Sequence, residues 1–178
     1  GAITAAFSTY FFQTEIMTLL YTNADLYWGQ VMGYLLFTFV AVSGTYIWGT
    51  LLTANGSLRE MNILLLVGVL CNVLLNWALI PEYKALGAAL ATLLTQFTTL
   101  FAQMLLAKKI FQLPFRWRYL AQILAFTLTV ASLSYLSYHH LPFGWFLNFS
   151  LNIMACLLAA LAFRLIHLGM IRVFLRRG

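Results

Sequence analysis

The chain alternates between long apolar stretches and short polar segments. A transmembrane helix needs about 20 mostly apolar residues to cross the hydrocarbon core of a bilayer, and six stretches reach or approach that length. The expected spans run from about Ala2 to Tyr21, Tyr27 to Leu52, Asn62 to Ile80, Ala85 to Leu106, Tyr119 to Tyr138 and Trp145 to Ile166. The pattern therefore predicts an all-α integral membrane protein with six transmembrane helices.

The three prolines support these boundaries. Pro81, Pro114 and Pro142 all fall between the expected spans. A proline at such a place leaves no unpaired backbone group in hydrocarbon, because its missing N–H lies outside the span. We therefore expect residues 1–166 to form one six-helix transmembrane domain, followed by a basic cytoplasmic tail over residues 167–178.

Composition separates this chain from soluble proteins. It is 63% hydrophobic and 8% charged, with a mean hydropathy of +0.90, whereas soluble domains are roughly 45–50% apolar and 25% charged. The net charge of +6 does not indicate nucleic-acid binding, because the ten Lys and Arg residues lie at the edges of apolar runs. Cys71 and Cys156 lie inside apolar segments and are expected to be core residues.

The basic residues fall almost entirely on one side of the expected topology. With Gly1 placed in the cytoplasm, only Lys84 lies outside. The inner side receives Arg59, Lys108, Lys109, Arg116, Arg118, Arg164, Arg172, Arg176 and Arg177. Because cytoplasmic loops of membrane proteins carry an excess of Lys and Arg, we expect both ends of the chain in the cytoplasm.

Glu15 is the one acidic residue well inside an expected span. A carboxylate is costly in hydrocarbon unless it meets a cavity or a partner, and Thr4 and Ser8 share its helical face by spacing. Glu15 is therefore either a residue that faces a substrate or a cation, or a carboxylate that reaches the outer interface about two turns away.

Two further spans carry polar side chains at helical spacing. Asn72 and Asn76 lie one turn apart in the third span, after Gly68. They indicate either interhelical hydrogen bonds, worth about 1–2 kcal/mol at most, or the lining of a polar pathway.

The fourth span has a polar stripe made of Thr92, Gln96, Thr99 and Gln103. Its steps of three or four residues make it the best candidate for a cavity wall. Small residues spaced for close helix packing are Gly29 and Gly33 in the second span and Gly87, Ala88 and Ala91 in the fourth.

Four basic residues follow the fourth span on the expected inner side. They are Lys108, Lys109, Arg116 and Arg118. They either bind the diphosphate of a lipid headgroup or anchor the chain to anionic lipids.

The sequence contains no Walker loop, dinucleotide glycine motif, HExxH or GxSxG. We therefore expect a protein that is not an enzyme, with no catalytic residue, metal or cofactor.

A resemblance to a known family lies in the segment from Leu51 to Gln96, which reads LLTANGSLREMNILLLVGVLCNVLLNWALIPEYKALGAALATLLTQ. It has a polar loop with Asn55, Gly56 and Arg59, a helix that closes on Leu79-Ile80-Pro81, and the small-residue segment Gly87-Ala88-Ala89-Leu90-Ala91-Thr92. It resembles the C-terminal lobe of polysaccharide-biosynthesis flippases, of O-antigen or capsule type, in the multidrug/oligosaccharidyl-lipid/polysaccharide exporter superfamily. The preceding FFQTEIMTLLYTNADLYWGQV resembles the first helix of that lobe. The family commonly has a glycine where this chain has Lys84.

The resemblance implies one lobe of a two-lobed exporter in a bacterial cytoplasmic membrane. Such an exporter flips undecaprenyl-diphosphate-linked oligosaccharide to the outer leaflet for envelope polysaccharide biosynthesis. Its partners would be that substrate, membrane lipids, an N-terminal lobe of the same protein and a glycan polymerase. Because the sequence begins with Gly1 and has no basic leader segment, we expect a fragment of a longer protein. The polar groups that this lobe offers to the substrate path are Glu15, Asn72, Asn76, Thr92, Gln96, Thr99 and Gln103.

Three other functions fit parts of the pattern. A cation-coupled multidrug or small-molecule antiporter of the same superfamily would use Glu15, although no second intramembrane acid accompanies it. A membrane glycan polymerase or glycosyltransferase would need a large outer loop or a catalytic acid, and the expected outer loops are short. A non-transporting scaffold of glycan assembly is also compatible with the sequence.

Overall fold

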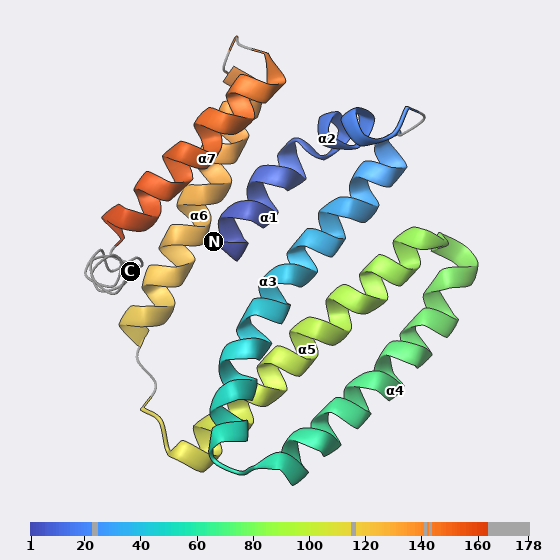
Figure 1. The fold of residues 1–178 in the computed structure, drawn as a ribbon, viewed down its shortest axis with the longest axis vertical. Coiled ribbons are helices and arrows are strands. Elements are labelled where there is room, and N and C mark those ends of the chain that lie inside the picture. Colours follow the sequence, from blue (N-terminus) through green and yellow to red (C-terminus); the bar gives the residue numbers. More distant parts are fainter. Residues whose placement is uncertain (23–24, 115–116, 141, 143, 164–178) are drawn as a thin grey trace, which may run out of the picture. The chain divides into compact units, whose positions relative to one another are not determined.

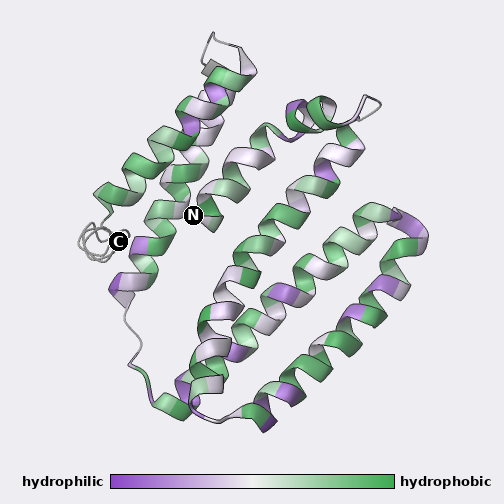
Figure 2. Ribbon diagram, viewed as in Figure 1, coloured by the Kyte–Doolittle hydropathy of each residue, from purple (hydrophilic) through white to green (hydrophobic). Residues whose placement is uncertain are grey.

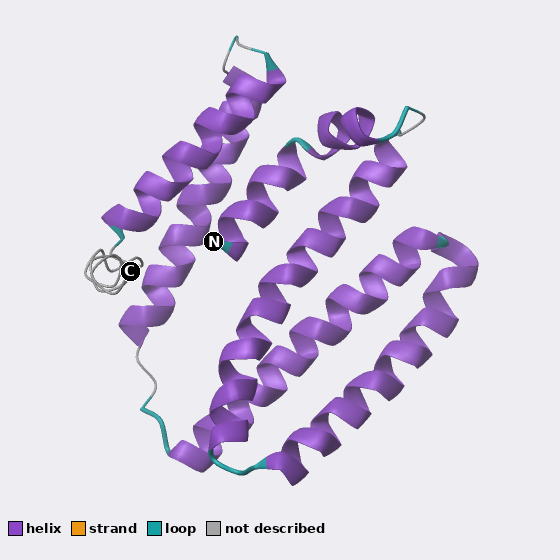
Figure 3. Cartoon of the chain, in the orientation of Figure 1, coloured by secondary structure: helices purple, strands orange, loops and turns teal. Residues whose placement is uncertain are grey.

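Helices make up nearly all of the part of the chain that the structure describes. This computed structural model describes residues 1–22, 25–114, 117–140, 142 and 144–163. Within these residues there are seven helices and no strand (Figure 3). The helices are α1 (Ala2–Phe11), α2 (Gln13–Leu20), α3 (Leu26–Ala54), α4 (Leu58–Tyr83), α5 (Ala85–Phe111), α6 (Trp117–His140) and α7 (Trp145–Ala162) (Figure 1). The predicted all-α class is confirmed.

Five helices, α3 to α7, are long and apolar enough to cross a membrane. The longest, α3, has 29 residues, which corresponds to about 43 Å of rise, and a bilayer core is about 30 Å thick. Figure 2 shows hydrophobic stretches along α4 and α7 and hydrophilic residues at the turn between α4 and α5. This arrangement is consistent with a multi-pass membrane protein.

The first expected span is corrected by the structure. In place of one helix from Ala2 to Tyr21 there are α1, with 10 residues, and α2, with 8 residues. The two are separated at Phe12, where φ is −102° and ψ is 18°, and Figure 1 shows α2 turned away from the axis of α1. The apolar run is interrupted by polar residues directly after this break, and neither helix alone approaches the length of a span. Those residues are Gln13, Thr14 and Glu15.

The helices divide into two units, Gly1–Phe115 and Arg116–Gly178. In the first unit, α3 and α4 both pack against α5, and α1 and α2 pack against α3. Small residues allow this: a Cβ atom at Gly44 of α3 would lie 2.6 Å from Leu100 Cδ1 of α5. Of the predicted packing residues, Gly29, Gly33, Gly87 and Ala91 are buried, and Ala88 is half-buried. Close packing of small residues is thereby confirmed at the four buried positions.

The turn between α4 and α5 differs from the prediction at Pro81. This proline lies inside α4, which continues to Tyr83, because a proline in the last turn removes only one backbone hydrogen bond. Tyr27 of α3 supports the turn: its hydroxyl donates to the Tyr83 carbonyl oxygen (3.1 Å) and accepts from the Leu86 N–H (3.2 Å). Groups left unpaired at the two helix ends are satisfied in this way.

In the second unit, α6 and α7 pack against each other. The buried residues of each helix recur at steps of three or four, as expected for one helix face. They are Phe126, Val130, Ser134 and Ser137 in α6, and Asn148, Asn152, Cys156 and Ala160 in α7. The Asn152 amide donates to Ser134 Oγ (3.1 Å) across the interface. The expected end of the last span at Ile166, the tail over residues 167–178, and Arg116 and Arg164 lie outside the described residues.

Candidate functional site

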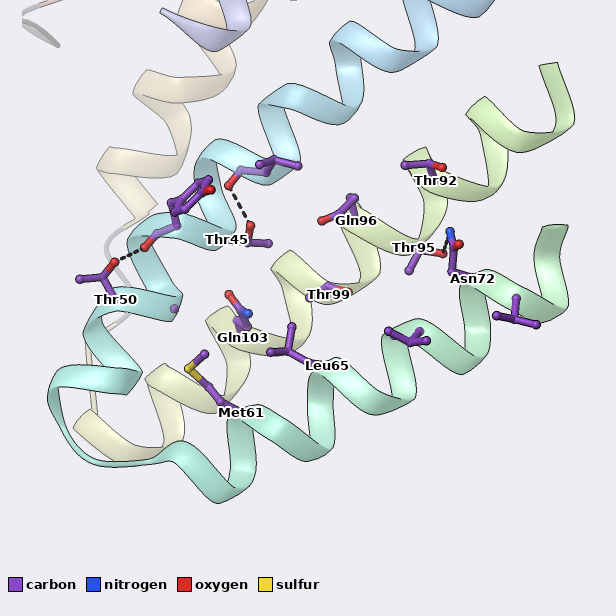
Figure 4. Close-up of a pocket in the computed structure, with 16 residues that line it drawn as sticks. Thr45, Thr50, Met61, Leu65, Asn72, Thr92, Thr95, Gln96, Thr99 and Gln103 are labelled. Atoms are coloured by element: carbon purple, nitrogen blue, oxygen red, sulfur yellow. Dashed lines mark hydrogen bonds between the residues drawn. The ribbon is translucent and has the colours of Figure 1, made fainter. Parts of the chain in front are cut away.

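The polar stripe of α5 forms one wall of a pocket between α3, α4 and α5 (Figure 4). The pocket has a volume of about 600 Å³, within the usual range for ligand sites of roughly 300–1,000 Å³. All four predicted residues of the stripe line it, and Asn72 joins them from α4. These four are Thr92, Gln96, Thr99 and Gln103. The structure therefore brings together five of the seven residues that the sequence suggested for a substrate path.

The α4 side of the pocket carries a short chain of hydrogen bonds. The Asn72 amide donates to Thr95 Oγ1 of α5 (3.3 Å), and the Asn76 amide donates to Asn72 Oδ1 (2.9 Å). Asn76 does not line the pocket itself. Thr95 is only 7% exposed and was missed by the sequence analysis. Asn72 thus combines the two roles considered for it, an interhelical hydrogen bond and a place in the polar lining.

The α3 side of the pocket was not predicted. Thr45, Gly49 and Thr50 line it, and their spacing of four and one residues gives no clear polar stripe. The two threonines bond within their own helix, since Thr45 Oγ1 donates to the Val42 carbonyl (2.8 Å) and Thr50 Oγ1 to the Tyr46 carbonyl (2.7 Å). Their hydroxyl oxygens keep lone pairs that can accept further hydrogen bonds.

Gln103 is the most deeply buried polar residue of the pocket lining. Its side chain is 3% exposed, and its Oε1 has no hydrogen-bond partner among the described residues. Figure 4 shows its amide directed from α5 toward α3. Gly49 lies opposite, where a Cβ atom would stand 3.6 Å from Gln103 Oε1 and 3.9 Å from Met61 Cε. A methyl group at position 49 would therefore stand in ordinary contact with this buried amide oxygen.

Glu15 lies away from this pocket, in α2. Because the helix breaks at Phe12, Glu15 does not share a continuous helical face with Thr4 and Ser8, which are buried in α1. Its Oε2 is buried and makes no hydrogen bond to any residue that the structure describes. The structure therefore places the Glu15 carboxylate apart from the polar pocket.

The predicted basic candidates fall into separate places. Lys108 and Lys109 are exposed in the last turn of α5, where their charge favours the negative end of the helix dipole. Lys109 lines a mostly apolar cavity of about 380 Å³ together with Glu60 of α4. Arg118 belongs to the other unit and lines a cavity of about 800 Å³ with Trp117, Tyr119 and Gln122. The two lysines and Arg118 thus belong to different units, and no common phosphate site can be described for them.

The pocket between α3, α4 and α5 is polar but uncharged. None of its 16 lining residues is Asp, Glu, Lys, Arg or His. Over the described ranges, no group of three or more His, Cys, Asp and Glu side chains could hold a metal ion. Amides and hydroxyls within an otherwise apolar lining fit a ligand that forms hydrogen bonds without carrying charge. No protein-family model, curated protein or solved structure matches this chain.

Proposed function

We propose that the chain is one lobe of a membrane transporter that flips a lipid-linked oligosaccharide across the bilayer. The observation that carries this proposal is the uncharged polar pocket on three helices of membrane-spanning length. The resemblance of Leu51–Gln96 to polysaccharide-biosynthesis flippases points the same way. In this proposal the lipid tail stays in the hydrocarbon while the sugar headgroup follows the polar groups of α3, α4 and α5.

The physical need for such a path is plain. A hydroxyl group moved from water into an apolar medium without a hydrogen bond costs roughly 2–7 kcal/mol, and an oligosaccharide carries many hydroxyls. From Thr92 to Gln103 the stripe on α5 covers about 16 Å of helix rise, which is about half of the hydrocarbon thickness. The remaining half would come from a second lobe, as in transporters built from two repeated bundles.

The position of Glu15 favours a flippase over a cation-coupled antiporter. An antiporter of this kind needs a carboxylate whose charge state is coupled to the bound substrate. Glu15 does not line the pocket, and none of the 16 lining residues is Asp or Glu. A cation-coupled antiporter that used this pocket would therefore lack the carboxylate that links cation binding to substrate binding.

Transport can be tested with the full-length protein in proteoliposomes. The substrate is a polyprenyl-diphosphate-linked sugar, and a membrane-impermeant glycosidase removes the sugar from every molecule that faces outward. We expect complete hydrolysis with the protein and about half in protein-free liposomes, where only the outer leaflet is accessible. Hydrolysis that stops at the same level with and without the protein would refute the proposal.

A double variant tests the pocket's part in transport. Asn76→Leu combined with Gln96→Leu removes two polar side chains, one from the hydrogen-bonded chain on α4 and one from the lining. Each lost hydrogen bond is worth about 1 kcal/mol, so we expect the flipping rate to fall about tenfold or more. Gln122→Leu on α6, outside the pocket, is the matched control and should flip at the rate of the unmodified protein. An unchanged rate in the double variant at equal reconstitution would remove these residues from the path.

A further inference from the structure

A second, mostly apolar hollow lies between α4 and α5, beside the polar pocket. It consists of two cavities of about 370 and 380 Å³, each lined from both helices. Two residues line both cavities, so the cavities meet and form one groove. The groove residues recur at steps of three or four along each helix, as expected for one helix face. They include Leu64, Val67 and Cys71 of α4 and Thr98, Ala102 and Leu105 of α5, of which Leu64 and Ala102 are shared.

The contact between α4 and α5 separates this groove from the polar pocket. Gly68, Thr95 and Thr99 line both and therefore form the boundary. The helices touch along it, because a Cβ atom at Gly68 would lie 3.1 Å from Thr99 Oγ1 and the Asn72 amide donates to Thr95 Oγ1. A lipid whose headgroup lies in the polar pocket cannot pass its tail across this boundary into the groove. The groove therefore suits a different lipid from the one proposed for transport.

The length of the groove suits one acyl chain. From Lys109 to Thr98 it covers about 16 Å of helix rise along α5, and one leaflet contributes about 15 Å of hydrocarbon, half of the bilayer core. At the inner end, the Thr98 hydroxyl donates its proton to the Leu94 carbonyl (2.8 Å). That end of the groove is thus compatible with hydrocarbon.

The other end of the groove carries two opposite charges. Glu60 lines it from the start of α4 and Lys109 from the end of α5, which lie at the same end of this helix pair (Figure 1). Both side chains are exposed, and within the described residues no ion pair joins them. A lysine there can bind a lipid phosphate, and a carboxylate can accept hydrogen bonds from an ammonium group. The pair complements a headgroup that carries both charges.

We propose that this groove binds a phosphatidylethanolamine, with one acyl chain between α4 and α5, the phosphate at Lys109 and the primary ammonium at Glu60. A choline headgroup has no N–H to donate to Glu60, and a glycerol headgroup has no positive charge. The site does not depend on the proposed transport. A lipid held here would stabilise α4, which has no buried residue of its own, against α5.

Crosslinking in nanodiscs tests the site on the full-length protein. The bulk lipid is phosphatidylcholine, and the probe is a trace of phosphatidylethanolamine with a photoreactive group in its acyl chain. We expect crosslinks at residues 63–71 and 98–106. Unlabelled phosphatidylethanolamine, phosphatidylglycerol and polyprenyl diphosphate are then compared as competitors at equal mole fraction. We expect the first to suppress these crosslinks about threefold more than the others, the effect of one exposed ion pair.

Each other result of the competition overturns the assignment. No suppression by phosphatidylethanolamine would mean that the bulk lipid binds equally well. Equal or stronger suppression by phosphatidylglycerol would make the groove a site for anionic lipid. Equal or stronger suppression by polyprenyl diphosphate would give the groove to the substrate proposed for transport.

Charge variants locate the headgroup. Lys109→Gln should lower crosslinking about fivefold, because one lysine contributes about that factor to phosphate binding. Lys108→Gln is its matched control, since Lys108 is also exposed in the last turn of α5 but does not line the groove. Glu60→Gln should remove the advantage of phosphatidylethanolamine over phosphatidylglycerol, and Glu82→Gln at the other end of α4 should keep it. Equal effects of a variant and its control would refute the headgroup contacts.

A filled groove tests the acyl chain separately. Ala102→Phe places a ring where the two cavities meet and leaves both charges in place. Leu94→Phe, at a residue of α5 that is 51% exposed and lies outside the groove, is the control. We expect Ala102→Phe to abolish the crosslinks at residues 63–71 and Leu94→Phe to retain them. Undiminished crosslinking in Ala102→Phe would overturn the groove, and the charge variants keep the proposal testable if this variant folds poorly.

Discussion

Lys84 adopts a backbone conformation that suits glycine. Its φ is 53° and its ψ is −126°, in a region where the Cβ atom of an L-residue is crowded. The backbone strain of such a residue destabilises the folded state by about 1–3 kcal/mol. Glycine would relieve the strain, but it also makes the unfolded chain more flexible, so only a part of this energy would appear as added stability. We expect Lys84→Gly to stabilise the protein by about 1 kcal/mol, measured as the free energy of unfolding in detergent.

Lys84→Ala is the control for the lost charge. Alanine keeps the Cβ atom, so it should give no comparable gain in stability if backbone strain is the cause. Equal stabilisation by alanine and glycine would assign the effect to the removal of the lysine side chain and would contradict this explanation.

At the same scale, the sequence could predict the site residues that repeat along one helix face. Thr92, Gln96, Thr99 and Gln103 stand out because polar residues at steps of three or four are conspicuous in an apolar span. Thr45 and Gly49 of α3 could not be found in this way, since a threonine that bonds to its own helix is common in membranes. The unpaired state of Gln103 Oε1 depends on what α3 places opposite it, which is information that only tertiary structure contains.

At the scale of elements, the contact between α4 and α5 depends on Gly87. A Cβ atom there would meet the Leu79 carbonyl oxygen, would lie 2.6 Å from the Leu79 carbonyl carbon and would lie 3.0 Å from Ile80 N. These are backbone atoms that cannot move without shifting α4. Overpacking of this kind costs about 1–3 kcal/mol, so we expect Gly87→Ala to lower the free energy of unfolding by about that amount.

Gly144→Ala provides the comparison. No heavy atom of the described residues lies within 4 Å of a Cβ built at Gly144, and Gly144 precedes α7 with an ordinary extended conformation. We expect this variant to unfold within about 0.5 kcal/mol of the unmodified protein. A small effect at Gly87, equal to that at Gly144, would mean that α4 and α5 can separate at little cost.

The long helices could be predicted because each is a nearly uninterrupted apolar run with polar turns at its ends. Asp25, for example, starts α3 by accepting hydrogen bonds from the N–H groups of Tyr27 and Trp28 (3.0 and 3.3 Å), as N-cap residues do. The break at Phe12 was missed because the residues on both sides of it favour a helix. Only the packing of α1 and α2 against α3, with the Gln13 side chain over Gly29 and Gly33, accounts for two helices in place of one.

At the scale of the whole molecule, the uneven distribution of basic residues predicts how the chain is oriented in the membrane. The two ends of α4 offer a test of this orientation. Glu60 and Glu82 are exposed residues near its two ends, separated by about 33 Å of helix rise, close to the thickness of the hydrocarbon core. Arg59 lies beside Glu60, and Lys84 lies beside the turn that follows Glu82. The excess of basic residues on the Glu60 side predicts that this end faces the cytoplasm.

Single cysteines at the two positions make the test symmetrical, because each replaces a glutamate of the same helix. The native cysteines are first removed as Cys71→Ala and Cys156→Ser, the latter keeping a donor toward Asn152 Oδ1, which Cys156 Sγ reaches at 3.5 Å. In intact cells we expect a membrane-impermeant maleimide to label Glu82→Cys at once and Glu60→Cys only after the membrane is permeabilised. The reverse pattern would invert the orientation, and labelling of both in intact cells would show that α4 does not span the bilayer.

In the expected orientation, the Gln103 end of the pocket lies nearer the cytoplasm, because α5 runs from the Lys84 turn toward Lys108 and Lys109. A headgroup that enters from the inner leaflet would then meet Gln103 before it reaches Gln96 and Thr92.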